Sequence, residues 1–208
     1  MATLAPFLQR LYYPVMALTE ASVCDFGWKA IDFDLAGVDG KRHTLASARG
    51  PNGLLVMFIC NHCPYVKHIR GGLARFARDY QPRGLAIVAV NANDVAAYPE
   101  DRPEKMAEEK RQAGYVFPYL YDETQEVAKA YRAACTPDFF LFDRSRRLVY
   151  RGQFDDSRPG NDRPVTGADL RRAADAVVAG DPVSPEQRPS IGCNIKWKAG
   201  RAPEYFTR

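Results

Sequence analysis

Hydrophobic residues form two uninterrupted runs in the first half of this chain. The runs at 54–59 and 85–90 have the length of strands and contain no charged residue, so we expect two buried strands that lie parallel to each other. Before them, 31–35 alternates apolar and polar residues as a half-buried strand does, and the Asp-Gly turn that follows leads to a return strand at 44–45. This half of the chain therefore predicts a hairpin followed by buried strands of a sheet.

Apolar residues at helical spacing lie between and after these strands. One helix is expected directly after residue 63, with Val66, Ile69, Leu73 and Phe76 toward the core. The other expected elements are a charged helix from an Asp101/Glu104 capping pair to near Gly114, a strand at 117–121, a helix that starts at 122–124, a hairpin of 139–142 and 148–150, and a last helix at 170–178. Strands that alternate with helices in this way indicate an α/β fold.

Composition is typical of a single-domain globular protein. The chain has 208 residues, of which 46% are hydrophobic, enough for one sizeable core. The net charge is +4, but the charged residues are scattered, so we expect no nucleic-acid partner. No apolar run reaches the roughly 18 residues of a membrane span, so no membrane association is expected either.

The pattern of the N-terminal region argues against a secretory signal. Pro14 interrupts the apolar run at 11–18, only Arg10 precedes that run, and no small-residue cleavage site follows it. The bulky Val23 before Cys24 argues against a lipoprotein. Five cysteines, an odd number, suit a reducing compartment better than a disulfide-stapled secreted domain, so we expect a cytoplasmic protein.

Candidate chemistry lies at the end of the first buried run, where Cys60 and Cys63 precede the expected helix. Residues three apart at a helix start face each other, so the two thiols can close a small disulfide. The free amides and the dipole of a helix N-terminus favour negative charge, so we expect Cys60 to ionise readily and to act as the nucleophile. Cys63, one turn further and more buried, would resolve the mixed disulfide. A Cys-x-x-Cys pair between a strand and a helix predicts a redox pair.

The segment Cys135-Thr136-Pro137 supports this interpretation, because it precedes another apolar strand far downstream of the cysteine pair. With both motifs, residues 32–180 resemble the thioredoxin-like fold, in the branch that spans the thioredoxins and the redoxins related to alkyl hydroperoxide reductase C and thiol-specific antioxidant proteins. The resemblance implies a three-layer α/β/α domain at 31–180 with a central mixed sheet and an N-terminal hairpin extension. We expect an N-terminal arm at 1–30 that packs on this domain and an irregular C-terminal tail at 181–208.

The same resemblance implies roles for individual residues. Thr136 and Pro137 would form a cis-proline loop that lies against the disulfide and, together with Asn61, binds the substrate. His62 is shared with the oxidising enzymes of this fold, and a protonated imidazole there would stabilise the Cys60 thiolate and make the disulfide more oxidising. Thioredoxin has a buried carboxylate on the strand before its motif as a proton acceptor, whereas this strand is apolar. Another group, or water, must therefore move the proton.

These residues predict a thiol–disulfide oxidoreductase that exchanges disulfides with protein or small-molecule thiol substrates and receives electrons from a thiol pool or a thioredoxin-type reductase. We expect no cofactor beyond its own disulfide, and no metal. One alternative is a peroxiredoxin-like antioxidant protein that acts on hydroperoxides, although 57–59 lacks the proline and the threonine or serine that peroxiredoxins carry there. Another is a copper- or zinc-binding protein with Cys60, His62 and Cys63 as ligands and Cys135 or Cys193 as a fourth.

Other polar and sulfur-containing residues have less specific surroundings. Cys193 lies in the expected tail, and we hypothesise that this tail folds back toward Cys60 so that Cys193 acts as an additional redox thiol. Cys135 and Cys24 are expected to be structural. Three polar residues that end the second buried strand either border the site or cap a turn: Asn91, Asn93 and Asp94.

Overall fold

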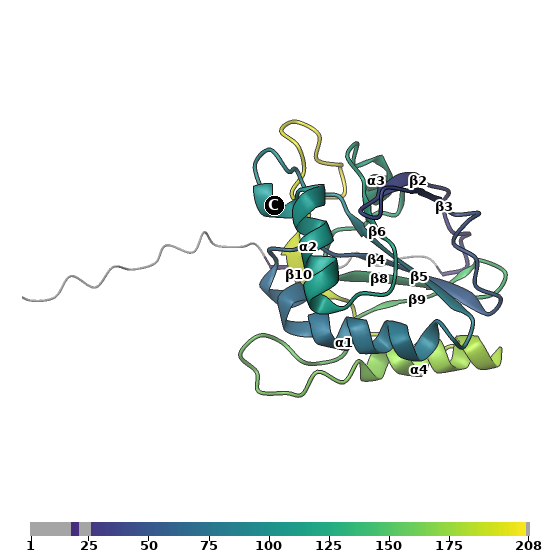
Figure 1. The fold of residues 1–208 in the computed structure, drawn as a ribbon. Coiled ribbons are helices and arrows are strands. Elements are labelled where there is room, and N and C mark those ends of the chain that lie inside the picture. Colours follow the sequence, from purple (N-terminus) through teal and green to yellow (C-terminus); the bar gives the residue numbers. More distant parts are fainter. Residues whose placement is uncertain (1–17, 21–25, 207–208) are drawn as a thin grey trace, which may run out of the picture.

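A mixed seven-stranded sheet forms the centre of the molecule (Figure 1). The computed structural model describes residues 18–20 and 26–206. In spatial order the strands are β3 (Arg42–Thr44), β2 (Asp34–Gly37), β6 (Tyr119–Tyr121), β5 (Leu85–Asn91), β4 (Gly53–Phe58), β8 (Asp138–Phe142) and β9 (Leu148–Gly152). β4 and β6 are both parallel to β5, whereas the other neighbouring strands pair antiparallel. The predicted mixed sheet, with a hairpin ahead of the two buried strands, is therefore confirmed.

The two faces of this sheet build two separate cores, because successive side chains of a strand point to opposite faces. In β4, Leu55 and Met57 belong to one core, while Leu54, Val56 and Phe58 belong to the other. All five side chains are at most 1% exposed. Burial on both faces explains why this strand has a continuous apolar run instead of an alternating pattern.

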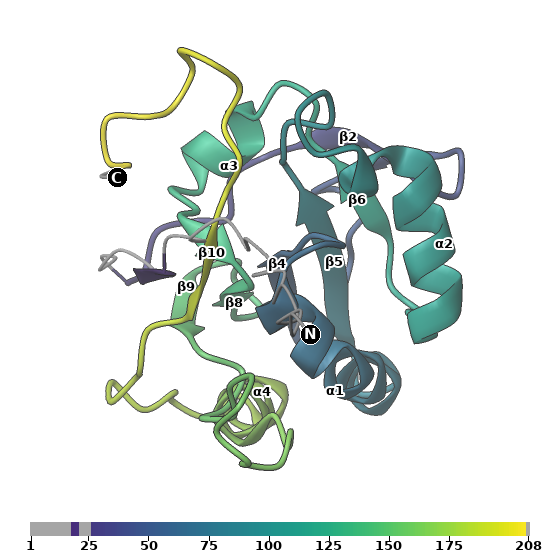
Figure 2. The same ribbon diagram turned by 90° about the vertical axis from the view of Figure 1, so that its left-hand side faces the viewer.

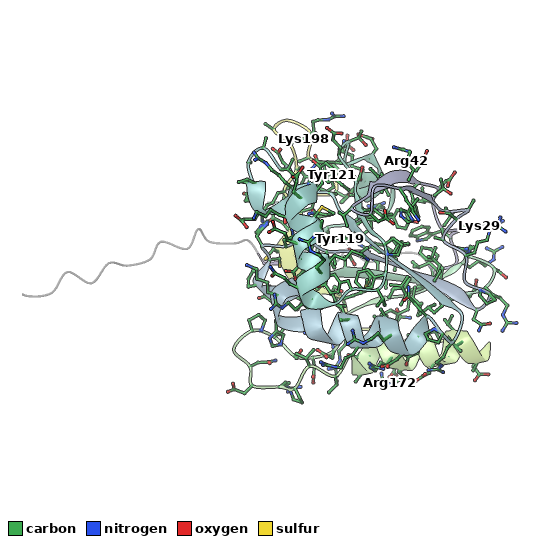
Figure 3. All side chains as sticks on the ribbon, in the orientation of Figure 1. Lys29, Arg42, Tyr119, Tyr121, Arg172 and Lys198 are labelled. Carbon is green, nitrogen blue, oxygen red and sulfur yellow. The ribbon has the colours of Figure 1, made fainter. Side chains whose placement is uncertain are left out.

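Helices cover both faces of the sheet and complete the three predicted layers. One face is covered by α1 (Pro64–Tyr80), α2 (Pro103–Ala113) and α4 (Ala168–Ala179). The other is closed by α3 (Glu126–Ala130), with Trp28 and Trp197 packed against the same core. Figure 1 shows α1 and α4 below the sheet and α3 above it. Tyr119 of β6 lies in the interior beside α2, whereas Arg172 of α4 lies at the periphery (Figure 3).

A second, three-stranded sheet joins segments that are far apart in the chain. Its middle strand is β10 (Ile191–Asn194), which pairs antiparallel with both β1 (Leu18–Glu20) and β7 (Cys135–Thr136). The expectation of an irregular tail at 181–208 therefore needs one correction, since β10 is a regular strand with a partner on each side. Figure 2 shows β10 in yellow, in front of β8. The arm expected at 1–30 falls largely on residues 1–17 and 21–25, which lie outside the described residues, as does Cys24.

The start of α2 also differs from the prediction. Asp101 does not cap this helix but ends a 3-10 helix (Pro99–Asp101), and its side chain is fully buried. α2 begins at Pro103, after Arg102, and has no capping hydrogen bond from a side chain. Its end at Gly114, with φ of 69°, agrees with the prediction. In the part of the chain that the structure describes, no helix combines the length and apolar character that a membrane crossing requires.

Candidate active site

Cys60 and Cys63 lie in the short connection between β4 and α1. The strand ends at Phe58, the helix begins at Pro64, and Cys63 is the residue directly before the first helical residue. Pro64 takes the first helical position, where no backbone N–H is needed for the helix. Both cysteines are free thiols, and they are only 1% and 0% exposed. The local sequence therefore places both sulfurs at the junction of strand and helix, beneath other parts of the chain.

Thr136 and Pro137 lie against this cysteine pair. The peptide bond that joins them is cis. Oγ1 of Thr136 is 3.4 Å from Sγ of Cys60, and the carbonyl oxygen of Thr136 is 3.1 Å from Sγ of Cys63. The fold thus brings together the two sequence motifs, Cys60-x-x-Cys63 and Thr136-Pro137.

Strand β10 brings a third sulfur to the same place. Its register pairs Cys193 with Thr136, and Sγ of Cys193 lies 2.9 Å from Sγ of Cys63. The tail folds back as hypothesised, but Cys193 meets Cys63 instead of Cys60. β10 thus pairs with Thr136, one of the residues that we expected to bind the substrate.

A buried carboxylate that was not predicted from the sequence completes the cluster. Oδ1 of Asp101 accepts a hydrogen bond from the backbone N–H of Asn61 at 2.8 Å. Oδ2 accepts one from Nδ2 of Asn93 at 2.8 Å and lies 2.6 Å from Nδ1 of His62. The local pattern around Asp101 resembles a helix cap and gives no sign of an inward-facing carboxylate. The only available signal was the polar end of β5, which supplies Asn93.

The three polar residues at the end of β5 divide between the two expected roles. Asn93 binds the carboxylate of Asp101, and Nδ2 of Asn91 donates to the carbonyl of Asp101 at 3.3 Å, so both border the site. Asp94 instead caps a turn, since its Oδ1 accepts from the N–H of Ala96 at 3.0 Å.

The imidazole of His62 is fixed on two sides. Nδ1 faces Asp101, and the ring stacks on Tyr98 with 5.1 Å between ring centroids and 12° between the planes. Nε2 is buried and has no hydrogen-bond partner among the described residues. This arrangement leaves one ring nitrogen for the carboxylate and one for another reaction partner.

The side chain of Asn61 is engaged within the protein. Its Oδ1 accepts a hydrogen bond from the hydroxyl of Tyr119 at 3.0 Å, and its Nδ2 donates to the carbonyl of Glu100 at 2.9 Å. Both ends of the amide have internal partners, so Asn61 positions the loop that carries the two cysteines. Its role in substrate binding stays a prediction.

The pKa shifts of the three thiols differ from one another, and the shift of Cys60 is opposite to the expected direction. Burial raises the pKa of the Cys60 thiol well above its ordinary value, and its hydrogen bond to Cys63 and the negative charge of Asp101 add to this effect. Burial would also raise the pKa of Cys63, but hydrogen bonds from Cys193, Cys60 and the Val66 amide lower it far below its ordinary value. The hydrogen bond from Cys193 to Cys63, together with burial, raises the pKa of Cys193. These directions make Cys63, the residue directly before α1, more acidic than Cys60, whereas the sequence led us to expect that Cys60 ionises readily.

One group of side chains could hold a metal ion. Cys60, His62 and Asp101 each offer a ligand atom, and these three atoms lie within 4.8 Å of one another. Both oxygens of Asp101 are already hydrogen-bond acceptors, and three ligands fall short of the four that a structural zinc site uses. Cys135, expected to be structural, is fully buried, with its sulfur 3.5 Å from the carbonyl oxygen of Pro137.

Comparisons with known proteins agree with this architecture. The crystal structure of an uncharacterized conserved protein from Geobacillus kaustophilus is 54% identical, covers 88% of this chain and 98% of its own, and superposes with a TM-score of 0.86. The thiol-disulfide oxidoreductase ResA of Geobacillus thermodenitrificans strain NG80-2 is 29% identical over 143 residues, which cover 68% of this chain and 78% of that protein.

A thiol:disulfide interchange protein of the thioredoxin family from Chlorobium tepidum TLS shares the fold, with a TM-score of 0.58 at 17% identity, over 75% of this chain and 99% of its own. The expected thioredoxin-like fold and the expected enzyme class, a thioredoxin-like oxidoreductase, are thus confirmed. The sequence profile of the AhpC/TSA family matches residues 26–151, more than half of the chain. The chain belongs to the AhpC/TSA family.

Proposed function

We propose that this protein catalyses thiol–disulfide exchange through Cys60 and Cys63, with a protein or small-molecule disulfide as its substrate. The observation that carries the proposal is the contact between this cysteine pair and Thr136, beside the cis-proline, with 3.4 Å between Sγ of Cys60 and Oγ1 of Thr136. The names of the curated relatives give further support. The reaction requires no cofactor, since two thiols and one disulfide interconvert by transfer of two electrons.

The first step belongs to Cys60, whose raised pKa keeps it protonated until a base removes the proton. His62 and Asp101, each with a polar atom within 4.8 Å of this sulfur, are placed to accept that proton. The resulting thiolate attacks one sulfur of the substrate disulfide. The substrate S–S bond breaks, a bond from Cys60 to the substrate forms, and one substrate thiolate leaves and takes up a proton.

Cys63 completes the reaction, and hydrogen bonds from Cys193 and from the Val66 amide lower its pKa and favour its thiolate. Its thiolate attacks Cys60 in the mixed disulfide, the bond from Cys60 to the substrate breaks, and the second substrate thiolate leaves. The substrate disulfide is reduced to two thiols, and the protein is oxidised to the Cys60–Cys63 disulfide. We propose a thiol pool or a thioredoxin-type reductase of the cytoplasm as the electron source, a location favoured by the odd number of cysteines.

Reduction of insulin disulfides by dithiothreitol, followed as turbidity, tests this function. The wild-type protein is expected to accelerate the reaction, and Cys60→Ser or Cys63→Ser is expected to abolish the acceleration. Cys135→Ser is the matched control, because Cys135 is equally buried but is outside the proposed mechanism. Full acceleration by the Cys60→Ser variant would overturn the proposal.

A second candidate function is the reduction of hydroperoxides, and the burial of Cys60 favours it. With 1% of this residue exposed, a small oxidant reaches the sulfur more easily than a protein disulfide does. The Cys60 thiolate would attack one peroxide oxygen and become a sulfenic acid, while the O–O bond breaks and the other oxygen leaves as hydroxide or alkoxide and takes up a proton. Cys63 would then attack the sulfenic sulfur, form the Cys60–Cys63 disulfide and release water. Consumption of hydrogen peroxide is measured at peroxide concentrations that saturate the protein thiols. Only a peroxidase consumes the peroxide, so this assay distinguishes peroxide reduction from disulfide exchange.

Metal binding remains a third candidate because of the proximity of Cys60, His62 and Asp101. Copper(I) or zinc would require the sulfur of Cys60 as a thiolate, and it would compete with the hydrogen bonds that Asp101 accepts from Asn61 and Asn93. Stoichiometric metal that survives dialysis of the purified protein, and that is lost in His62→Ala, would support this function. A metal-free protein that is active in the insulin assay would exclude it.

A further inference from the structure

We infer that Cys193 is a third redox-active cysteine, which can replace Cys60 as the disulfide partner of Cys63. This inference deepens the proposed function and rests on it. Its basis is the distance of 2.9 Å between the sulfurs of Cys63 and Cys193, two residues that lie 130 positions apart in the chain. Cys63 also shares a hydrogen bond with Cys60, so its sulfur has two possible disulfide partners.

The backbone around Cys193 is built to hold its sulfur at this position. β10 pairs with β7 on one side, where Cys193 lies opposite Thr136, and with β1 on the other. Gly192 allows the close approach of these strands, because a Cβ atom there would lie 2.1 Å from the carbonyl oxygen of Thr136.

The chain on both sides of β10 is anchored to the thioredoxin-like domain. Before the strand, the hydroxyl of Ser190 donates to the carbonyl of Gly152 at 2.7 Å. After it, the N–H of Lys196 donates to Oδ1 of Asn93 at 2.8 Å, and the N–H of Lys198 donates to Oε1 of Gln125 at 2.9 Å. Cys193 is therefore held in place by ordered structure, and its sulfur does not approach Cys63 as part of a loose terminus.

The exchange step is balanced within the protein. Cys193 loses its proton, and its sulfur attacks Cys63 in the Cys60–Cys63 disulfide formed by substrate turnover. The Cys60–Cys63 bond breaks, the Cys63–Cys193 bond forms, and Cys60 leaves as a thiolate that takes up a proton. No electrons leave the protein, one disulfide and one thiol are present before and after, and Cys60 returns to the thiol form.

The Cys63–Cys193 disulfide has a structural consequence that the Cys60–Cys63 disulfide lacks. A Cys60–Cys63 bond closes a very short loop, whereas a Cys63–Cys193 bond ties β10 to the start of α1 across 130 positions of the chain. Cross-links that close long loops restrict the unfolded chain most. The Cys63–Cys193 form is therefore expected to raise the melting temperature by roughly 10 °C over the reduced form, more than the Cys60–Cys63 form does.

Disulfide mapping tests the inference. Wild-type protein, Cys60→Ser and Cys193→Ser are equilibrated in glutathione buffers of increasing oxidation, where oxidised glutathione accepts the two electrons. The samples are then quenched in acid, alkylated and analysed as peptides. We expect both disulfides in the wild type, only Cys63–Cys193 in Cys60→Ser, and only Cys60–Cys63 in Cys193→Ser. Melting curves of oxidised and reduced Cys60→Ser are expected to differ by the shift given above.

The outcomes separate this inference from the function on which it rests. If no Cys63–Cys193 peptide forms in the wild type or in Cys60→Ser, the inference is overturned, while a Cys60–Cys63 peptide leaves the proposed function intact. Absence of the Cys60–Cys63 peptide from both the wild type and Cys193→Ser would overturn the proposed function instead. Should Cys193→Ser fail to fold, the wild type and Cys60→Ser still decide whether the second disulfide exists.

Discussion

Oδ2 of Asp101 lies 2.6 Å from Nδ1 of His62, and both side chains have a polar atom within 4.8 Å of the sulfur of Cys60. The carboxylate fixes the orientation of the imidazole and leaves the other ring nitrogen free of protein hydrogen bonds among the described residues. The resemblance to thioredoxin implies a proton acceptor on the strand before the cysteine motif, where β4 has none. In this protein Asp101, 41 positions after Cys60 and on a different segment, brings a carboxylate within 4.8 Å of the Cys60 sulfur.

The first prediction concerns this carboxylate. Asp101→Asn keeps an acceptor for the N–H of Asn61 but removes the negative charge beside His62. We expect disulfide exchange near neutral pH to slow by about 100-fold, the lower range for loss of a positioned acid–base group. The pKa of Cys60 is raised partly by the charge of Asp101, so the variant should form the Cys60 thiolate at lower pH than the wild type does.

A pH–rate profile measures this effect. The deficit of Asp101→Asn should shrink as the pH rises, because the Cys60 thiol then ionises without a base. Asp94→Asn is the matched control, since Asp94 is on the same loop but caps a surface turn. Equal rates for Asp101→Asn and the wild type at every pH would show that the carboxylate takes no part in proton transfer.

The second prediction concerns the thiolate of Cys63. Its pKa is lowered, so the sulfur stays ionised as the pH falls far below the ordinary cysteine value of about 8.5. The reduced wild-type protein should therefore show the ultraviolet absorbance of one thiolate at neutral pH. Cys63→Ser should lose this absorbance, whereas Cys60→Ser should retain most of it. A thiolate signal that disappears with Cys60→Ser would instead restore the assignment expected from sequence.

The third prediction uses the close approach of β10 to β7. Gly192→Ala would place a Cβ atom 2.1 Å from the carbonyl oxygen of Thr136, so β10 must move away. The buried thiols should become more accessible, and their alkylation by iodoacetamide should accelerate by roughly tenfold, which corresponds to opening that costs about 1.4 kcal/mol less. Gly71→Ala is the control, because a Cβ there meets only the end of the flexible Arg75 side chain at 3.5 Å. An unchanged rate in Gly192→Ala would mean that β10 does not limit access.

The fourth prediction concerns a buried ion pair next to the cis-proline loop. Arg151 contacts Asp138 at 2.9 Å, and the two side chains are 3% and 0% exposed. Arg151→Ala leaves the Asp138 carboxylate buried without its partner, so the free energy of unfolding should fall by about 3–5 kcal/mol in urea denaturation. Arg172→Ala, which removes an exposed pair with Asp169, should change it by less than about 1 kcal/mol.

The pH dependence of Arg151→Ala follows from the sign of the shift. Burial already raises the pKa of Asp138, and loss of Arg151 raises it further. A carboxyl whose pKa is higher in the folded state destabilises the fold once the unfolded chain is ionised. The loss of unfolding free energy in Arg151→Ala should therefore shrink as the pH falls from the raised pKa of Asp138 in the folded protein toward its pKa of about 3.9 in the unfolded chain. A deficit that stays constant with pH would indicate lost packing alone.

Local patterns predicted most of the domain correctly. The apolar runs at β4 and β5, the helical face of α1 and the end of α2 at Gly114 were all evident before the structure. They are predictable because burial on both faces of a sheet, or on one face of a helix, is a property of consecutive residues. Asp101 was misassigned for the same reason, since its neighbours have the pattern of a helix cap.

The sequence alone determined the class of fold and the place of Cys60 and Cys63 between a strand and a helix, because these depend on short-range periodicity. The tertiary structure decided which groups surround those sulfurs. Asp101 reaches His62 across 39 positions, and Cys193 reaches Cys63 across 130. The tertiary structure also decided which thiol is the more acidic, because the pKa values of Cys60 and Cys63 depend on burial and on hydrogen bonds from distant segments. Such contacts arise only when the chain has folded, so no spacing along the sequence predicts them.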